Sequence, residues 1–416
     1  MVRKINVCRI CGNDELVPVV DLGEQYLTGV FPRPDEITNI TKGPLKLVKC
    51  HFGDNSCGLL QLEHSYELSE MYGDNYGYRS GLNKSMVSHL KNKVKNILNI
   101  VNLNHGDLVI DIGSNDGTTL SEFNSNLHLV GIDPTGEKFK EYYPEHVELI
   151  SDFFTDKLIR ESYPNKNAKV ITSFSMFYDL ESPQEFVDQI SNILDQKEGI
   201  WVFEQSYMPL MLERKSYDTI CHEHLEYYGL EQIIWLLDRA GLKIIDVEVN
   251  DINGGSFSVT AAHKNSQYLR NDKKINQFLL LEKRAELNTI EPYLNFHLDA
   301  KKSRNELKEF ISNSKNNGQT ISALGASTKG NVILQYCNID SSQIESIGEV
   351  NANKFGTLTP GSLIPIDSEE SVLSKESDYL IVLPWHFRDF FVKNSKFNGR
   401  KLVFPLPGLE IIIPNN

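Results

Sequence analysis

Short apolar runs alternate with amphipathic segments through the middle of the chain. Residues 108–112 (LVIDI) and 128–132 (HLVGI) are bounded by turn residues, which predicts buried parallel strands. Apolar residues at helical spacing over 84–101 predict a helix before them. The further strands that the pattern predicts are 170–174, 199–204 and a closing antiparallel pair, 242–249 with 256–262.

A second alternating unit begins near residue 320. The pattern predicts a strand over 320–325, then Ala326-Ser-Thr-Lys-Gly330 and a helix over 331–336. Residues 266–317 are rich in Lys, Glu, Asn and Leu, which predicts one or two linking helices with a charged, solvated face. The remaining predicted strands are 346–350, 379–383 and 401–404.

The composition is that of an ordinary globular protein. The 416 residues suffice for two or three domains, with 40% hydrophobic and 24% charged residues. No 18-residue apolar run predicts a membrane span, and the N-terminus lacks the apolar core of a signal peptide, so we expect a cytoplasmic protein. The net charge of −14 disfavours nucleic acid as a partner, but it allows a small anionic substrate.

Four of the six cysteines lie near the N-terminus. Cys8 and Cys11 form a C-x2-C knuckle, and Cys50 and Cys57 a wider C-x6-C pair. Four thiolates predict a closed structural zinc site, because they leave no position for a catalytic water. Two alternatives stay open: His51 replaces one thiolate, or the second pair is free thiols beside an empty knuckle.

These patterns predict an α/β protein in three parts. We expect an N-terminal zinc-binding domain, a central Rossmann-like domain and a C-terminal Rossmann-like domain. The predicted division is 1–68, 69–265, a helical linker over 266–317, and 318–416.

The first strand of the central unit leads into a glycine turn. Gly113 and Gly117 follow this strand, and Asp133 ends the next strand, 22 residues after Asp111. This pattern resembles the cofactor site of class I S-adenosylmethionine-dependent methyltransferases, where the second acidic residue holds the ribose. The alternative is a doubly wound domain for another nucleotide or for none. The cofactor contacts that the resemblance implies are Asp111, Gly113, Asn115, Gly117, Asp133, Pro134, Asp152, Phe153 and Ser173.

The segment 217–229 (YDTICHEHLEYYG) concentrates acid–base side chains. His222, Glu223 and His224 are consecutive, so in a helix they would point about 100° apart, whereas in a loop Glu223 and His224 could both reach a substrate. A histidine base beside a carboxylate is suited to removing a proton next to a carbonyl, but it equally suits O-methylation. Two further interpretations stay open for this segment: a metal site at His222 and His224, and a polar helix start with buried histidines.

Three signatures in order resemble the sugar C-methyltransferases of deoxysugar biosynthesis. They are the paired cysteines, the methyltransferase core with Glu223-His224, and the C-terminal Gly-Ala-Ser-Thr-Lys-Gly330 unit. The resemblance covers essentially the whole chain and implies a nucleotide-linked 4-keto-6-deoxyhexose as substrate. It implies that His224 abstracts the C3 proton, with Glu223 beside it. The chain departs from better-known members at Cys221, where they have tyrosine, and at His222, where they have aspartate; Tyr217, Tyr227 or Tyr228 could replace the lost phenol, and His222 could be a second acid or base.

The same resemblance implies substrate contacts elsewhere in the chain. Tyr76 and Tyr78 match a segment that reaches over the active site, with a helix-entry turn as the alternative. Lys329 opens the C-terminal helix, where backbone N–H groups, hydroxyls and its ammonium could hold a diphosphate. The substrate-binding candidates are Lys329, Ser327, Asn331, Gly254, Gly255 and Lys354.

We thus expect a nucleotide-sugar substrate and a monomer or weak homodimer. Two other functions remain open at this point. One is O- or N-methyl transfer, and the other is a non-catalytic zinc-ribbon scaffold with a methyltransferase fold.

Overall fold

The computed structural model describes residues 2–415 apart from 38–39, 52, 54–55 and 72–78. Its N-terminal part is an antiparallel sheet of order β11-β4-β3-β2. The fourth strand, β11, comes from far along the chain, directly after Glu223 and His224. The strands of this sheet are β2 Leu16–Tyr26, β3 Lys42–Cys50, β4 Leu60–Leu62 and β11 Glu226–Tyr227. A separate antiparallel pair consists of β1 Arg3–Lys4 and β5 His64–Ser65.

The central sheet has seven strands in the order β12-β13-β10-β9-β6-β7-β8. The five strands from β10 to β8 are parallel, and β13 pairs antiparallel with both β10 and β12. This confirms the strands predicted from the apolar runs, including the closing antiparallel pair. Their bounds are β6 Leu108–Ile112, β7 His128–Ile132, β8 Val147–Ile150, β9 Ala168–Phe174, β10 Ile200–Ser206, β12 Leu242–Asn250 and β13 Ser256–His263.

The C-terminal sheet has the order β16-β15-β14-β17-β18-β19. It is parallel except for its last strand, β19. The helix after β14 is α10, Thr328–Tyr336, which begins three residues before the predicted start because Ser327 caps it: its Oγ accepts the N–H of Gly330. The strands are β14 Ile321–Leu324, β15 Ile347–Glu349, β16 Ile366–Ser368, β17 Tyr379–Val382, β18 Leu402–Phe404 and β19 Glu410–Ile412.

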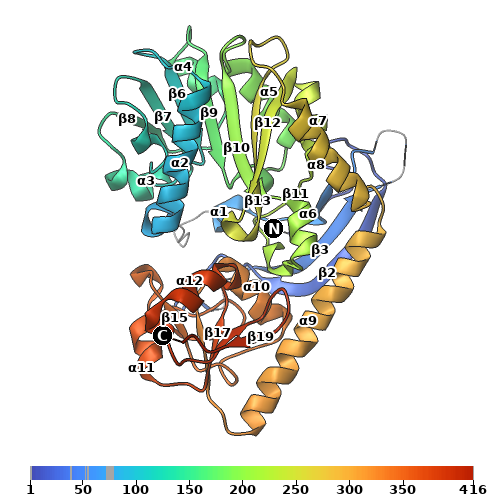
Figure 1. The fold of residues 1–416 in the computed structure, drawn as a ribbon, viewed down its shortest axis with the longest axis vertical. Helices are drawn as coiled ribbons and strands as arrows, with labels where there is room; N and C mark the ends of the chain where they lie inside the picture. Colours follow the sequence, from blue (N-terminus) through green and yellow to red (C-terminus); the bar gives the residue numbers. More distant parts are fainter. Residues whose placement is uncertain (1, 38–39, 52, 54–55, 72–78, 416) are drawn as a thin grey trace.

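Two helices join the central and C-terminal sheets. They are α8, Asp272–Arg284, and α9, Glu291–Asn316, which runs beside β2 along both units (Figure 1). None of the helices in the described part of the chain is long and apolar enough to cross a membrane. The other α-helices are α1 Leu68–Met71, α2 Lys84–Ile100, α3 Gly136–Phe139, α4 Asp156–Ser162, α5 Pro183–Ile193, α6 Met208–Glu213, α7 Leu230–Arg239, α11 Glu369–Ser374 and α12 Arg388–Lys393.

Candidate active site

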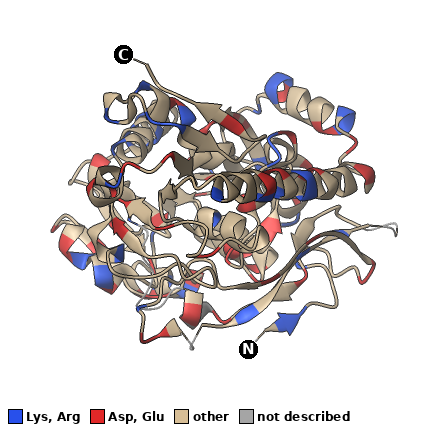
Figure 2. Cartoon of the chain, turned by 90° about the horizontal axis from the view of Figure 1, so that it is seen from below, with Lys and Arg blue, Asp and Glu red and all other residues tan. Residues whose placement is uncertain are grey.

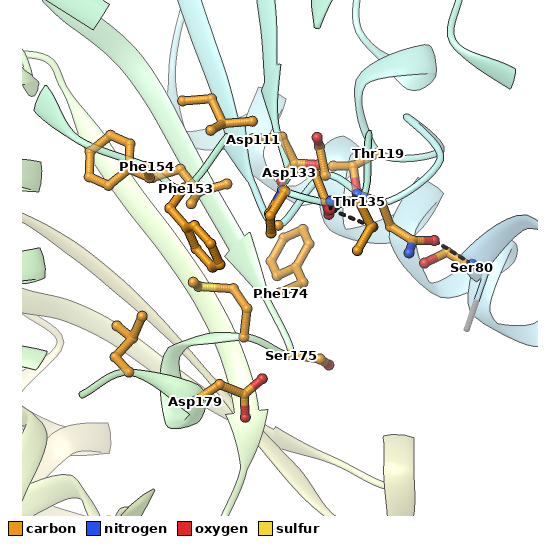
Figure 3. Close-up of a pocket in the computed structure, with 18 of the residues that line it drawn as sticks. Ser80, Asp111, Thr119, Asp133, Thr135, Phe153, Phe154, Phe174, Ser175 and Asp179 are labelled. Carbon is orange, nitrogen blue, oxygen red and sulfur yellow. Dashed lines mark hydrogen bonds between the residues drawn. The ribbon is translucent and has the colours of Figure 1, made fainter. Parts of the chain in front are cut away.

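A cavity of about 260 Å³ lies at the carboxyl ends of β6, β7 and β9. The strand order reverses at β6, which has β7 on one side and β9 on the other. Doubly wound sheets bind their ligands at such a switch point. Figure 3 shows acidic, hydroxyl and aromatic side chains around this space. Predicted cofactor residues that line it are Asp111, Gly113, Asn115, Asp133, Pro134, Asp152 and Phe153.

The glycine turn is held in place by the second acidic residue. Gly113, Asn115 and Gly117 have φ values of 72°, 51° and 74°, so the chain enters the left-handed region three times after β6. Asp133 Oδ2 accepts the N–H of Asn115 at 2.8 Å, and its Oδ1 accepts the N–H of Thr135 at 2.7 Å. These bonds fix a carboxylate at the cavity wall, where a ribose hydroxyl can donate to it.

Asp111 lies deeper, inside β6. Its Oδ1 accepts a hydrogen bond from the Thr172 hydroxyl at 2.6 Å. Burial raises the pKa of Asp111 to about 7, although the hydroxyls of Thr172 and Thr119 oppose that shift. Burial also raises the pKa of Asp133, against its hydrogen bonds from Thr135 and Asn115.

Two predicted cofactor residues need correction. Ser173 is fully buried and accepts the indole N–H of Trp201, so its side chain lies on the far side of β9 from the cavity. Gly117 packs against the Tyr143 ring and supports the turn from behind. The cavity instead takes Ser175 and Asp179 from the segment after β9, which the carboxyl-end rule for parallel strands would have indicated.

The four N-terminal cysteines meet at one point. Their sulfurs all lie within 4.8 Å of one another, and the Cys8–Cys57 and Cys11–Cys50 sulfurs are each 3.5 Å apart. Zinc–sulfur bonds of about 2.3 Å at a tetrahedral ion require sulfurs about 3.8 Å apart, so the cluster fits zinc. Among the described residues the cluster contains these cysteines alone, which excludes His51 as a replacement ligand there.

Arg9, inside the zinc knuckle, contacts both the wall of the cofactor cavity and strand β11. Its side chain is only 3% exposed, and its Nε lies 3.7 Å from both Glu181 Oε2 and Glu226 Oε1. Glu181 lines the cofactor cavity, and Glu226 begins β11 just after the Glu223–His224 pair. The knuckle therefore holds the cavity wall together with the segment that contains Glu223 and His224.

Residues 221–225 form a loop, not the start of a helix. His224 Nδ1 lies 2.8 Å from the carbonyl oxygen of Thr219. A carbonyl only accepts, so Nδ1 carries the proton and Nε2 is left with its lone pair. The ring packs against Tyr178 with centroids 4.3 Å apart, and burial together with the Lys329 charge lowers the pKa of His224 to about 3.

Glu223 faces the N-terminal part of the chain. The backbone of Gly29 approaches it so closely that a Cβ there would overlap its Oε1. Burial raises the pKa of Glu223, against hydrogen bonds from Cys221, Thr28 and Gly29. The carboxyl group of Glu223 is therefore protonated more readily than that of an exposed glutamate. The neighbouring His224, by contrast, is protonated less readily than an exposed histidine.

His222 points the other way. It is completely buried, with its ring edge-on to Tyr66 at 4.6 Å, and it does not line the cavity. The metal alternative at His222 and His224 also finds no support, because these residues join no metal-type cluster in the described chain. Tyr76 and Tyr78 lie outside the described residues.

Three tyrosines were predicted as replacements for the tyrosine that other family members have at the position of Cys221. Tyr217 is buried against Tyr336, and Tyr228 stacks on Phe177, so both belong to the core. Tyr227 is also buried in the core, and burial, followed by the charges of Cys221 and Asp179, raises its pKa.

Lys329 joins the C-terminal helix α10 to Thr219, just before the loop 221–225, and to Asn253. Its Nζ donates to the carbonyl of Asn253 at 2.6 Å and to the Thr219 hydroxyl at 3.4 Å. No described carboxylate oxygen lies within 4.0 Å of that ammonium, and burial lowers its pKa. Gly254, with a φ of 89°, faces both Lys329 and His386.

His386 lies beside Gly254 and Lys329, although the sequence motifs do not indicate it. It follows β17, the strand beside β14 at the switch point of the C-terminal sheet. Burial and the Lys329 charge lower its pKa to about 3. Its position after a central parallel strand is the signal that could have indicated it.

The remaining substrate candidates stand at the boundary between domains. Lys354 Nζ donates to the Ala326 carbonyl at 2.8 Å and lies over the Phe31 ring. Asn331 is buried, and its amide donates to the Thr28 carbonyl, so it holds the N-terminal part against α10 rather than facing a ligand. Gly255, next to Gly254, has a φ of 127° and packs against Leu210.

Three family models match consecutive parts of the chain. They are described as "Putative zinc binding domain" over residues 8–72, "Methyltransferase domain" over 86–247, and "C-methyltransferase C-terminal domain" over 251–407. C-methyltransferase NovU of Streptomyces niveus is 28% identical over 418 positions, which cover 99% of this chain and 98% of NovU.

Solved methyltransferase structures resemble only part of the chain. An S-adenosylmethionine-dependent methyltransferase from Clostridium acetobutylicum is 14% identical, with a TM-score of 0.33, and covers 44% of this chain and 92% of its own. The N-methyltransferase NodS of Bradyrhizobium japonicum is 13% identical, with a TM-score of 0.32, over 44% of this chain and 89% of its own. The consecutive family matches and the full-length similarity identify this protein as an S-adenosylmethionine-dependent C-methyltransferase with an N-terminal zinc-binding domain.

Proposed function

We propose that the enzyme methylates C3 of a nucleotide-linked 4-keto-deoxysugar, with His224 as the base. One observation carries this proposal: the bond from His224 Nδ1 to Thr219 leaves Nε2 as a proton acceptor in the loop between the cofactor cavity and α10. A base in this loop can remove a proton from a carbon atom beside a ketone, and that carbon then accepts the methyl group.

The proposed reaction begins with proton transfer from C3 to His224 Nε2. The electron pair of the C–H bond becomes an enolate with its negative charge on the C4 oxygen. S-adenosylmethionine supplies the methyl group that C3 receives. The ketone re-forms, and His224 afterwards releases its proton to water.

Two lysines near the start of α10 support a nucleoside diphosphate as the rest of the substrate. The ammonium groups of Lys329 and Lys354 both donate to backbone carbonyls, and burial lowers the pKa of each. Asp218 and Glu349 partly oppose that lowering for Lys329 and Lys354 respectively, but neither forms an ion pair within 4.0 Å among the described residues. Two buried cations so close to one turn favour an anionic ligand. In the view of Figure 2, basic and acidic residues are interspersed over the chain, which favours a small anionic acceptor over nucleic acid.

The product and an exchange reaction test the proposal. The enzyme is incubated with S-adenosylmethionine labelled with ¹³C in the methyl group and a nucleoside-diphosphate 4-keto-6-deoxyhexose. We expect an NMR signal for a methyl group on carbon and, with S-adenosylhomocysteine in D₂O, deuterium incorporation at C3. A methyl signal on oxygen, or methylation without C3 exchange, would favour O-methyl transfer instead.

Replacing Asp133 with asparagine should weaken binding of S-adenosylhomocysteine by about tenfold or more, because one charge-assisted hydrogen bond to the ribose contributes about 1.5–3 kcal/mol. Titration calorimetry measures this change. The exposed Asp272 offers a matched control, since D272N removes the same charge at the start of α8. Equal affinity of D133N and the wild-type enzyme would remove Asp133 from the cofactor site.

Replacing Lys329 with methionine should raise KM for the sugar nucleotide by about tenfold, because a charge-assisted contact to the diphosphate is lost. It should also move the acid limb of the pH–rate profile upward from about pH 3, because burial and then the Lys329 charge lower the pKa of His224 to about 3, and the variant lacks that charge. The exposed Lys315 gives the control variant K315M. An unchanged KM together with an unchanged profile would contradict both roles.

A further inference from the structure

A buried carboxylate on β10 faces the helix that lines one side of the cofactor cavity. Glu204 is 3% exposed, and its Oε1 lies 2.6 Å from His89 Nε2 of α2. Its Oε2 lies 2.7 Å from Lys93 Nζ, one turn further along the same helix. Burial acts to raise the pKa of Glu204, but the hydrogen bond with His89 and the charge of Lys93 lower it, so the carboxyl group is ionised. Buried ion pairs add little net stability over apolar packing, so packing alone does not account for this carboxylate.

The same part of α2 contributes to the wall of the cofactor cavity. Met86 and Leu90, which flank His89 along the helix, both line that cavity. The backbone of Glu204 reaches the cavity as well, because its carbonyl accepts the N–H of Ser175 at 2.7 Å and Ser175 is a lining residue (Figure 3). Two parts of the cavity wall, one on α2 and one after β9, are therefore joined directly to Glu204.

Glu204 is also bonded to the start of the loop between β12 and β13. Asn250 ends β12, and its amide donates to Glu204 Oε2 at 2.8 Å. The Oδ1 of Asn250 accepts the N–H of Ile252 at 2.9 Å, which fixes the beginning of the loop. The carbonyl of Asn253, further along this loop, accepts the Lys329 ammonium at 2.6 Å. The position of the loop thus determines where that ammonium lies.

We propose that Glu204 is a positioning residue that couples the two binding sites, so that S-adenosylmethionine and the anionic part of the substrate strengthen each other's binding. This inference rests on the proposed function, because it assigns the diphosphate to Lys329. A cofactor packed against α2 and Ser175 holds Glu204 in place, and Glu204 in turn holds Asn250 and the loop that orients Lys329. The loop is then already ordered when the diphosphate binds, which removes part of the conformational entropy that binding would otherwise cost.

The coupling is measured by titration calorimetry on the full-length enzyme. Uridine diphosphate and thymidine diphosphate are each titrated with and without saturating S-adenosylhomocysteine. We expect S-adenosylhomocysteine to raise the affinity for a diphosphate that binds by about fivefold or more, the lower end of the usual coupling between sites. The reverse titration should give the same factor, because coupling between two binding sites is reciprocal.

Variants at the two ends of the Glu204–Asn250 bond test its role. N250D removes the amide donor but keeps an oxygen to accept the N–H of Ile252, so each ligand alone should bind nearly as in wild type, while the coupling factor falls to about one. N250A should do the same without an added charge. E204Q should also lower the coupling, because its single acceptor oxygen cannot serve His89, Lys93 and Asn250 together. The exposed Asn265, in the turn after β13, supplies the control N265D, which should retain wild-type coupling.

Hydrogen exchange shows the coupling without the diphosphate. The N–H groups of Gly254 and Gly255 are bonded within the loop, to the carbonyls of Asp251 and Ile252. S-adenosylhomocysteine should slow exchange in a peptide covering residues 250–256 of wild type, and it should slow it much less in N250D and N250A. Mass spectrometry measures both rates, and thermal unfolding checks that each variant folds.

Each outcome has a distinct meaning. A wild-type enzyme that binds a diphosphate with the same affinity in both conditions would overturn the inference and leave the proposed function standing. Full coupling in both N250D and N250A would overturn it too, even if each ligand alone bound more weakly, because Asn250 would then only support the structure. If wild type bound neither uridine diphosphate nor thymidine diphosphate, the proposed function itself would fail, and this inference with it.

Discussion

Replacing His224 with asparagine should reduce methyl transfer by about 10²–10⁴-fold, the usual contribution of a general base. Asparagine keeps a polar side chain in the loop but cannot accept the C3 proton. Deuterium exchange at C3 should fall by the same factor, because the same base serves both reactions. NMR follows exchange and methylation in one sample, and circular dichroism checks the fold.

Two comparisons make this result specific. The exposed His105 lies in the turn before β6, and H105N should retain wild-type rates. Exchange at the wild-type rate in H224N would assign the base to another residue. Loss of methylation with retained exchange would place His224 in methyl transfer rather than in deprotonation.

The pH dependence of the methylation rate is a second test of His224 as the base. Burial and the Lys329 charge lower the pKa of His224 to about 3, so the imidazole stays neutral at ordinary pH. The neutral form is the base, so protonation of His224 should produce no acid limb between about pH 5 and pH 8. A limb near pH 6.5 that disappears in H224N would contradict the lowered pKa.

Loss of zinc should have the second large effect. Replacing Cys11 with serine should abolish stoichiometric zinc and lower the free energy of unfolding by several kcal/mol, because binding energy at a structural zinc site is folding energy. Metal analysis and differential scanning calorimetry measure the two changes. Chelation of the wild-type protein should reproduce them.

The activity of the same variant tests the coupling through Arg9. Arg9 contacts Glu181 and Glu226 from inside the knuckle, so disorder there should weaken S-adenosylhomocysteine binding and slow methyl transfer together. Cys337 is a buried cysteine outside the cluster, so C337S should retain one zinc per chain even if it is less stable. A zinc-free C11S enzyme with wild-type stability would contradict a structural role for the metal.

Local patterns in the sequence determined the parts of the fold that depend on neighbouring residues. The apolar runs predicted β6, β7, β9 and β10, because buried parallel strands need continuous apolar sequence. Gly113 and Asp133 marked the cofactor cavity, since a glycine turn and a strand-end acid form from short segments. The four cysteines predicted their own cluster by residue type.

Only the tertiary structure decided the direction in which each side chain of the loop 221–225 points. Glu223 lies against Gly29 and His224 packs on Tyr178, whereas His222 faces Tyr66. The loop is fixed by distant bonds: the Leu225 N–H donates to the Tyr178 carbonyl, and the Leu62 N–H donates to the Leu225 carbonyl. Side-chain direction in an irregular loop has no periodicity, so the sequence alone could not assign it. The bond between Glu204 and Asn250 likewise joins two strands, β10 and β12, that come together only in the folded sheet.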